Sequence, residues 1–254
     1  MLGALGGTFG YAMGLALSPI AITTILVLLT GERRGHLRGF VFAIGWFIGV
    51  FVITLVPMLL TDVAHDDDPS GTETGLDILH LVFAAVFFIL AVVTWIKRPA
   101  HDRVRSTEPA LVGAEAVHPR RDALVHEAAD LEPADKKGFL SRIDDLGVWA
   151  CLGLGIAQAI IILKDIPLGI SAGTTLGATD LTDAGQVVSV IVFSVLASLA
   201  LLLPLLVSVL GGAKVDDALR EWRRWIEANM TAITLVVLLV VGVIFLGQGL
   251  GVAG

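Results

Sequence analysis

The chain has 254 residues, of which 56% are hydrophobic and 16% charged, and its mean hydropathy is +0.86. Soluble domains carry about 25% charged residues, so this composition excludes an ordinary soluble domain and indicates a membrane protein. The net charge of −7 says little by itself, because the position of charges matters more than their sum in a membrane protein. A single cysteine, Cys151, rules out an intrachain disulfide.

Six apolar stretches are each long enough to cross about 30 Å of hydrocarbon as a helix. In chain order they cover residues 9–30, 39–61, 77–96, 147–171, 186–210 and 230–252. The N-terminus carries no Lys or Arg, so we expect it to begin the first span rather than to form a signal peptide. The sequence therefore predicts an all-α integral membrane protein with six transmembrane helices.

Basic residues are confined to one side of this predicted layout. All but one of the 17 Lys and Arg residues lie in the connections after spans 1, 3 and 5, while the connections after spans 2 and 4 are acidic. Because basic loops stay in the cytoplasm, we predict a multi-pass plasma-membrane protein with both termini outside. The exception is Lys164, inside the fourth span.

Two of the basic connections have further features. Residues 97–146 are charged and rich in Ala, Pro and His, which predicts a flexible cytoplasmic linker between two membrane units, 1–96 and 147–254. Residues 214–229 place apolar and tryptophan side chains on one helical face, a pattern typical of a helix lying in the headgroup plane. An ordinary amphipathic connector is the alternative for 214–229. The apolar face consists of Leu219, Trp222, Trp225 and Ile226.

Arginines cluster in two of these connections. They either set the topology only or attract anionic lipid headgroups. The candidate headgroup-recruiting residues are Arg33, Arg34, Arg38, Arg220, Arg223 and Arg224.

Prolines recur in corresponding helices of the two halves. Pro19 and Pro167 lie in spans 1 and 4, Pro57 and Pro204 lie in spans 2 and 5, and spans 3 and 6 have none. Because each half has three spans, the second half would enter the membrane in the opposite sense. This predicts two inverted three-helix repeats, which in transporters place the substrate site near the midplane at broken helices.

The fourth span holds the least expected residues. The apolar region 147–178 would run about 48 Å as one straight helix, and Pro167 disrupts the backbone bonding of a helix interior. We therefore predict an unwound or bent segment around 164–170, followed by a re-entry through Gly169 and Gly173. The alternative is that the span ends near residue 163 and that the charged side chains reach the outer interface.

Lys164 and Asp165 are adjacent, so on a regular helix they would point about 100° apart and would not pair as i, i+4 residues do. Each is costly to bury in a membrane, by about 3 kcal/mol. Lys164 is predicted to hold an anionic group. Asp165 is predicted to pair with Lys164, accept a proton, or order the unwound backbone.

Other polar residues in the spans have two readings. Hydroxyls near Pro19 either restore helix hydrogen bonds or contact substrate; they belong to Ser18, Thr23 and Thr24. Gln158 and Gln248 are expected to make interhelical bonds rather than to bind substrate, although Gln158 remains a substrate-site candidate. Glycines are expected to allow close helix packing at Gly45, Gly49, Gly153 and Gly155.

The first span reads "GLALSPIAITTILVLL" and is followed by a basic turn. It resembles the start of the actinobacterial GAP/Sap family of peptidoglycolipid- and sulfolipid-addressing proteins, within the wider LysE superfamily of exporters. That family carries an Asn-Pro-Lys-Asn type motif in span 4, followed by small residues ending in Gly. Here "LKDIPLGISAG" matches the Lys and the final "SAG", whereas Leu163 and Asp165 depart from the motif and Pro167 comes later.

The resemblance implies six spans in two halves and the export of cell-envelope glycolipids, or of small solutes in the family's relatives. We predict an ion-coupled exporter or flippase of an anionic envelope lipid, since no phosphate-binding loop for ATP is visible. The alternatives are a LysE-type exporter of amino acids or cations and a non-transporting scaffold for envelope-lipid export. No enzyme activity, cofactor, metal or nucleic-acid partner is predicted. Expected partners are membrane lipids, the lipid or small-molecule substrate, a second copy in a homodimer, and envelope-lipid synthesis or export proteins.

Overall fold

The computed structural model describes residues 2–31, 35–67, 69–96, 147–162, 164–179, 181–211 and 215–251. Within these ranges all regular secondary structure is α-helical, which confirms the predicted all-α class. The helices are α1 (Leu2–Ala16), α2 (Pro19–Leu29), α3 (Gly35–Asp67), α4 (Pro69–Ile96), α7 (Val148–Ile161), α8 (Asp165–Gly177), α9 (Asp183–Gly211) and α10 (Asp216–Gly249). The predicted linker 97–146 lies outside the described residues.

Four helices are long and apolar enough to cross a membrane by themselves, and they correspond to predicted spans 2, 3, 5 and 6. Their apolar segments are Gly35–Val63, Thr74–Ile96, Asp183–Gly211 and Asp217–Gly249. Predicted spans 1 and 4 are each a bent pair, with 55° between α1 and α2 and 77° between α7 and α8. The described residues therefore contain four to six spans, depending on whether each bent pair crosses.

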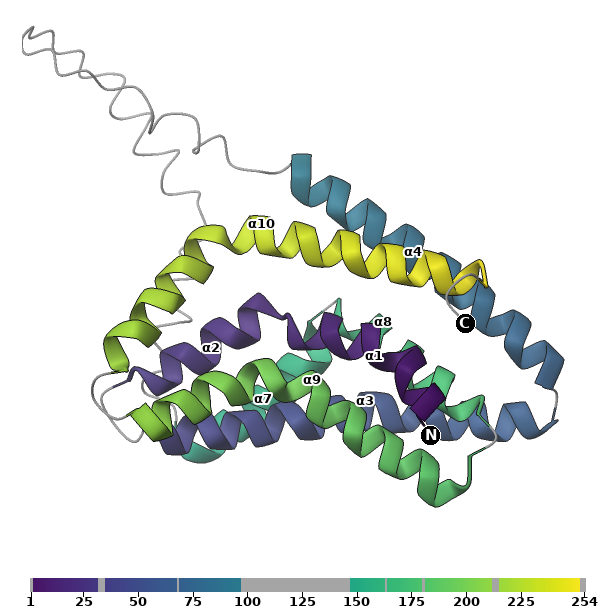
Figure 1. Ribbon diagram of the computed structural model, residues 1–254, viewed down its shortest axis with the longest axis horizontal. Coiled ribbons are helices and arrows are strands. Elements are labelled where there is room, and N and C mark those ends of the chain that lie inside the picture. Colours follow the sequence, from purple (N-terminus) through teal and green to yellow (C-terminus); the bar gives the residue numbers. More distant parts are fainter. Residues whose placement is uncertain are drawn as a thin grey trace, which may run out of the picture.

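The broken helices pack across the two halves of the chain. The α7–α8 pair lies against α3, the α1–α2 pair lies against α9, and α4 lies against α10. Figure 1 shows α4 and α10 running together along one edge, with α3 and α9 on the opposite side of α1 and α2. The core between them includes large buried aromatic side chains: Tyr11, Phe42, Trp46, Phe87, Phe193 and Phe245.

Helices α3 and α9 are antiparallel and are joined by a polar contact at each end. At the start of α3, His36 Nδ1 lies 2.9 Å from Ser208 Oγ near the end of α9. Towards the far end of α3, Asp62 Oδ1 accepts a hydrogen bond of 2.5 Å from Gln186 Nε2 near the start of α9. Both helices continue through their internal prolines, Pro57 and Pro204.

Glycines set the close approach of α7 to α3. A side chain at Gly45 would collide with the carbonyl oxygen of Leu152, and one at Gly155 would collide with that of Phe42. Gly49 likewise faces α7, so the packing prediction is confirmed for these three glycines. It is wrong for Gly153, where a Cβ would have no neighbour within 4 Å.

The predicted interfacial helix over 214–229 is not a separate element. Its described part is the beginning of α10, which continues into the last span without interruption. Its apolar face is also divided, because Leu219 and Ile226 are buried in the protein core while Trp222 and Trp225 are exposed. The physical reason is local, since "EANMTA" at the expected boundary contains neither Gly nor Pro to stop the helix.

Candidate functional site

The first helix break forms at Ser18 and Pro19. Pro19 is the first residue of α2, where a proline is well tolerated because its missing N–H would have no partner there. Ser18 caps the helix with an extended backbone (φ −89°, ψ 103°), but its buried hydroxyl makes no cap bond and has no partner among the described residues. The break leaves the final carbonyl groups of α1 without the donors that a continuous helix would supply.

The second break differs from the predicted one. The predicted bend in this span is confirmed by the 77° between α7 and α8, but it lies between Ile161 and Asp165 rather than around 164–170. Pro167 is the third residue of α8, and a proline in the first turn removes no intrahelical hydrogen bond. The chain therefore turns before Pro167.

Lys164 connects the two breaks. Its Nζ donates a hydrogen bond of 3.1 Å to the carbonyl oxygen of Gly14 in α1 and lies 2.5 Å from Asp165 Oδ1. In an unbroken helix the Gly14 carbonyl would accept from the N–H of Ser18. The ammonium group therefore provides a donor at the carbonyl from which the first break removes one.

The ion pair corrects the expectation that these adjacent side chains would not face each other. Lys164 has helical backbone angles (φ −75°, ψ −24°), so the pairing comes from the length of the lysine side chain, which reaches Asp165 from its own direction. Lys164 is 8% exposed and Asp165 is 0% exposed. Both charges are thus enclosed by protein, unlike the alternative in which they extend to an outer interface.

Helix ends favour this arrangement of charge. The C-terminal end of a helix carries partial negative charge and the N-terminal end partial positive charge. Lys164 contacts the C-terminal part of α1, and Asp165 occupies the first turn of α8. Asp165 Oδ2 is buried without a hydrogen-bond partner among the described residues, so the carboxylate keeps one free acceptor.

A second polar contact joins the other two segments of the broken helices. Gln158 Nε2 in α7 donates to Thr24 Oγ1 in α2 at 3.1 Å, which confirms the predicted interhelical bond. Thr24 Oγ1 in turn donates to the carbonyl oxygen of Ile20 at 2.9 Å, so this hydroxyl does supplement the helix bonding. Thr23 Oγ1 and Gln158 Oε1 are buried and have no partner within the described part of the chain.

Helix α8 is held tightly against α3. A side chain at Gly169, Gly173 or Gly177 would collide with residues of α3, two of them with backbone carbonyl oxygens. The predicted glycine-rich re-entry is therefore a helix face with a regular spacing of four residues. This face fixes the position of the Lys164–Asp165 pair at the start of α8.

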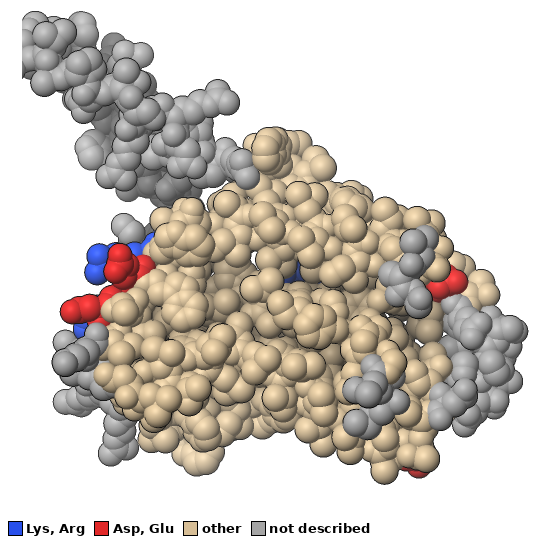
Figure 2. Space-filling view, viewed as in Figure 1, with Lys and Arg blue, Asp and Glu red and all other residues tan. Residues whose placement is uncertain are grey.

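The four candidate headgroup-recruiting arginines that the structure describes are not part of this centre. Arg33 and Arg34 lie outside the described residues, and Arg38 is half-buried near the start of α3. In α10, Arg220 and Arg224 are exposed, while Arg223 pairs with Glu227 at 2.8 Å. Figure 2 shows Lys and Arg side chains together with Asp and Glu at the end where α3 and α10 begin, and further Asp and Glu side chains at the opposite end of a largely uncharged body.

Sequence reasoning missed a buried network between α1, α4 and α10. Tyr11 Oη donates to Gln248 Oε1 at 2.7 Å and lies 3.0 Å from His80 Nε2, while Gln248 Nε2 donates to the Gly7 carbonyl at 3.0 Å. Phe245 packs beside both rings. The available signals were that Tyr11 is the only tyrosine in the chain and that His80 interrupts an apolar span. The network includes the interhelical bond predicted for Gln248.

The described residues contain no group of three His, Cys, Asp or Glu side chains that could hold a metal ion. The long apolar helices, the two broken pairs and the enclosed ion pair together define a multi-pass α-helical membrane protein. The model of the family described as "Sap, sulfolipid-1-addressing protein" matches residues 9–251, and the chain belongs to this family. No curated protein and no solved structure matches the chain. The family resemblance is thereby confirmed, and membership of the LysE superfamily is consistent with it.

Proposed function

We propose that the chain exports an anionic cell-envelope lipid across the plasma membrane, with the Lys164–Asp165 pair as the headgroup site. The family description refers to the addressing of a sulfolipid, a class of lipid with an anionic headgroup. The observation that carries the proposal is the buried Lys164 ammonium at the meeting point of two broken helices. Broken helices provide polar groups inside a membrane, which is where transporters bind charged substrates.

The ion pair suggests how binding would be coupled to a proton. An arriving sulfate or other anionic group would compete with Asp165 for the Lys164 ammonium. A carboxylate that loses its cation in a buried site is strongly favoured to take up a proton. Asp165 would then hold the proton while the anion occupies Lys164, so that the charge inside the protein stays balanced. This scheme uses ion coupling and no ATP.

The proposed repeat would explain how the site faces each side in turn. The order of a broken helix, a proline-containing long helix and a second long helix occurs twice along the chain. Each broken pair packs against the long proline-containing helix of the other half, and the third helices pack against each other. This reciprocal packing is what a two-fold relation between inverted repeats would produce. Rocking of one repeat against the other would then expose the site alternately.

The direct test is lipid export in cells that carry Lys164→Ala or Asp165→Asn. We expect both variants to lose most export, because the first removes the anion-binding cation and the second the proton acceptor. Thr94→Val is a matched control, since its hydroxyl bonds only the Leu90 carbonyl of its own helix. Full export by both variants, at normal protein levels, would refute the site assignment.

A substrate screen separates lipid export from export of small solutes. Thermal unfolding of the purified protein should shift upward with sulfated or phosphorylated lipids, because a ligand that binds only the folded state stabilises it. Free amino acids and divalent cations should cause no shift. A shift with those solutes and none with lipids would instead favour the small-solute exporter.

A further inference from the structure

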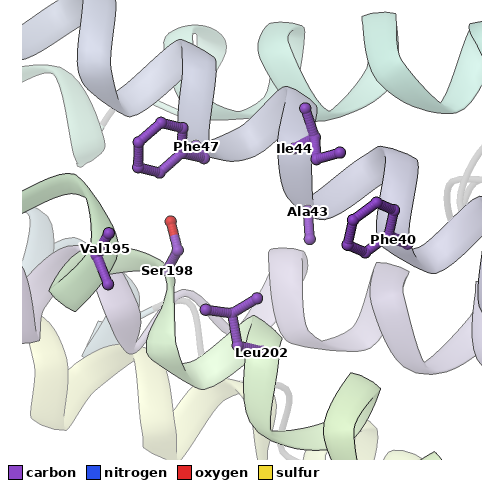
Figure 3. A pocket seen from close by; sticks show the side chains of 7 residues that line it. All are labelled: Phe40, Ala43, Ile44, Phe47, Val195, Ser198 and Leu202. Atoms are coloured by element: carbon purple, nitrogen blue, oxygen red, sulfur yellow. The ribbon is translucent and has the colours of Figure 1, made fainter. Parts of the chain in front are cut away.

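A groove between α3 and α9 is not used by the proposed headgroup site. Its volume is about 150 Å³. Figure 3 shows side chains of the two helices facing each other across it. The lining residues are Phe40, Ala43, Ile44 and Phe47 from α3 and Val195, Ser198 and Leu202 from α9. The Ser198 hydroxyl already donates to the Ser194 carbonyl at 2.8 Å, so the groove offers little to a polar ligand.

The groove opens onto the exposed surface of two candidate membrane spans. Phe40, Ile44 and Val195 are 51%, 38% and 43% exposed, and all three lie within candidate membrane spans. Ala43 and Ser198 are buried, and their small side chains leave the space that the larger residues border. An apolar hollow on a surface that faces lipid is filled by hydrocarbon rather than by water.

The position of the groove along the membrane span is defined by the residues that line it. Its α3 residues follow Gly35 by only five to twelve positions, which places it in the half of the span nearest the basic end. His36 lies one turn before Phe40, is exposed, and contacts Ser208 of α9. A polar rim is therefore followed by an apolar hollow along the same helix pair. This is the order of headgroup and acyl chain for a lipid in the leaflet on the basic side.

We propose that this groove binds an acyl chain of a membrane lipid whose headgroup lies near His36. The groove can hold only part of such a chain, because an apolar cavity of about 150 Å³ accommodates a molecule the size of benzene. The remainder of the chain would lie in the bilayer beside α3 and α9. The role of the bound lipid rests on the proposed function. In that scheme the lipid in the groove is the transported lipid, held there before its headgroup moves to Lys164.

Photolabelling of the full-length protein tests the site directly. The protein is reconstituted into nanodiscs that contain a phospholipid with a diazirine in its acyl chain, irradiated, and analysed by peptide mass spectrometry. We expect the peptides around Ala43 and Ser198 to be labelled several-fold more than those around Val92 and Val236, which are exposed to lipid on α4 and α10. Equal labelling of all four regions would identify ordinary surrounding lipid and overturn the proposal.

Filling the groove gives a second measurement. Ala43→Phe and, from the opposite wall, Ser198→Leu should each reduce labelling of the groove by half or more. Val52→Phe is the matched control, because Val52 is a lipid-exposed residue of α3 outside the groove. If one groove variant fails to fold, the other variant and the distribution of label in the wild-type protein still test the proposal. Unchanged labelling in a folded groove variant would contradict the site.

Labelling reports occupancy without transport, so the two proposals can fail separately. A Lys164→Ala protein should lose export and still show the groove label. If the wild-type protein shows the groove label but exports no lipid, the groove proposal stands and the proposed function is refuted. Loss of the label in a Lys164→Ala protein that is still folded would show that the groove has no lipid affinity of its own, and would overturn the inference.

Discussion

At the residue scale, the Lys164 ammonium lies between two acceptors of different kinds, the Gly14 carbonyl and the Asp165 carboxylate. Only the carboxylate can be neutralised by a proton. A buried ion pair contributes little net stability, but removal of one partner leaves an uncompensated charge and is costly. The residue pair is thus sensitive to the loss of either charge and much less sensitive to the loss of both.

This asymmetry can be measured with a double-mutant cycle. Lys164→Met should destabilise the protein by about 3–5 kcal/mol, because Asp165 is then buried without its cation. The double variant Lys164→Met/Asp165→Asn should be more stable than Lys164→Met alone. Thermal unfolding in the same detergent provides the comparison. Additive effects of the two single changes would show that the pair is not coupled.

The Tyr11 network permits a second residue-scale prediction. Tyr11→Phe removes one hydroxyl and leaves both His80 Nε2 and Gln248 Oε1 short of a partner. We expect a loss of about 1 kcal/mol, because polar contacts between membrane helices contribute from about 0.6 to about 2 kcal/mol. The midpoint of thermal unfolding should fall accordingly. Thr30→Val, which affects only bonds within α2 and its cap, should lower it much less.

At the element scale, α8 depends on the absence of side chains along one face. A methyl group at Gly173 would collide with the Thr54 carbonyl oxygen of α3, whereas one at Gly153 would meet nothing within 4 Å. The two glycines lie in helices of the same broken span, and only one of them faces α3 closely. Replacing each glycine by alanine therefore separates two effects, the loss of close packing at Gly173 and the gain in helix propensity at Gly153.

Gly173→Ala should destabilise the protein by about 1–3 kcal/mol, the usual cost of overpacking a tight contact. Gly153→Ala should be neutral or should stabilise it by up to about 1 kcal/mol, because alanine is the better helix former. Thermal unfolding of both variants provides the test. Equal effects would mean that α8 does not pack on α3 through its glycine face.

At the scale of the whole molecule, the basic residues predict the orientation in the membrane. The chain has one cysteine, so a Cys151→Ala background allows single cysteines to be placed at will. A cysteine at Thr182 should react with an impermeant maleimide in intact cells, and one at Glu221 should react only after lysis, if basic loops lie in the cytoplasm. The reverse labelling pattern would contradict the predicted orientation in the membrane.

The sequence predicted whole elements better than their contacts. Long apolar runs located the four continuous spans, and Pro19 marked the first break where the structure has it. The second break was predicted too late because Pro167 fits a first helical turn. The Tyr11–His80 contact could not be predicted, since it exists only once α1 and α4 have both packed against α10. The groove likewise depends on the register of α3 against α9.

The hydrogen bond from Lys164 to Gly14 has a consequence for how this family would be studied by comparing sequences. The acceptor belongs to the peptide backbone, so no exchange of side chain at position 14 can remove it. Covariation between positions 14 and 164 would therefore carry no trace of this contact, and an alanine substitution at position 14 would leave the acceptor in place. Replacing the peptide group by an ester, which weakens the carbonyl acceptor, is the kind of chemical substitution that would reveal it.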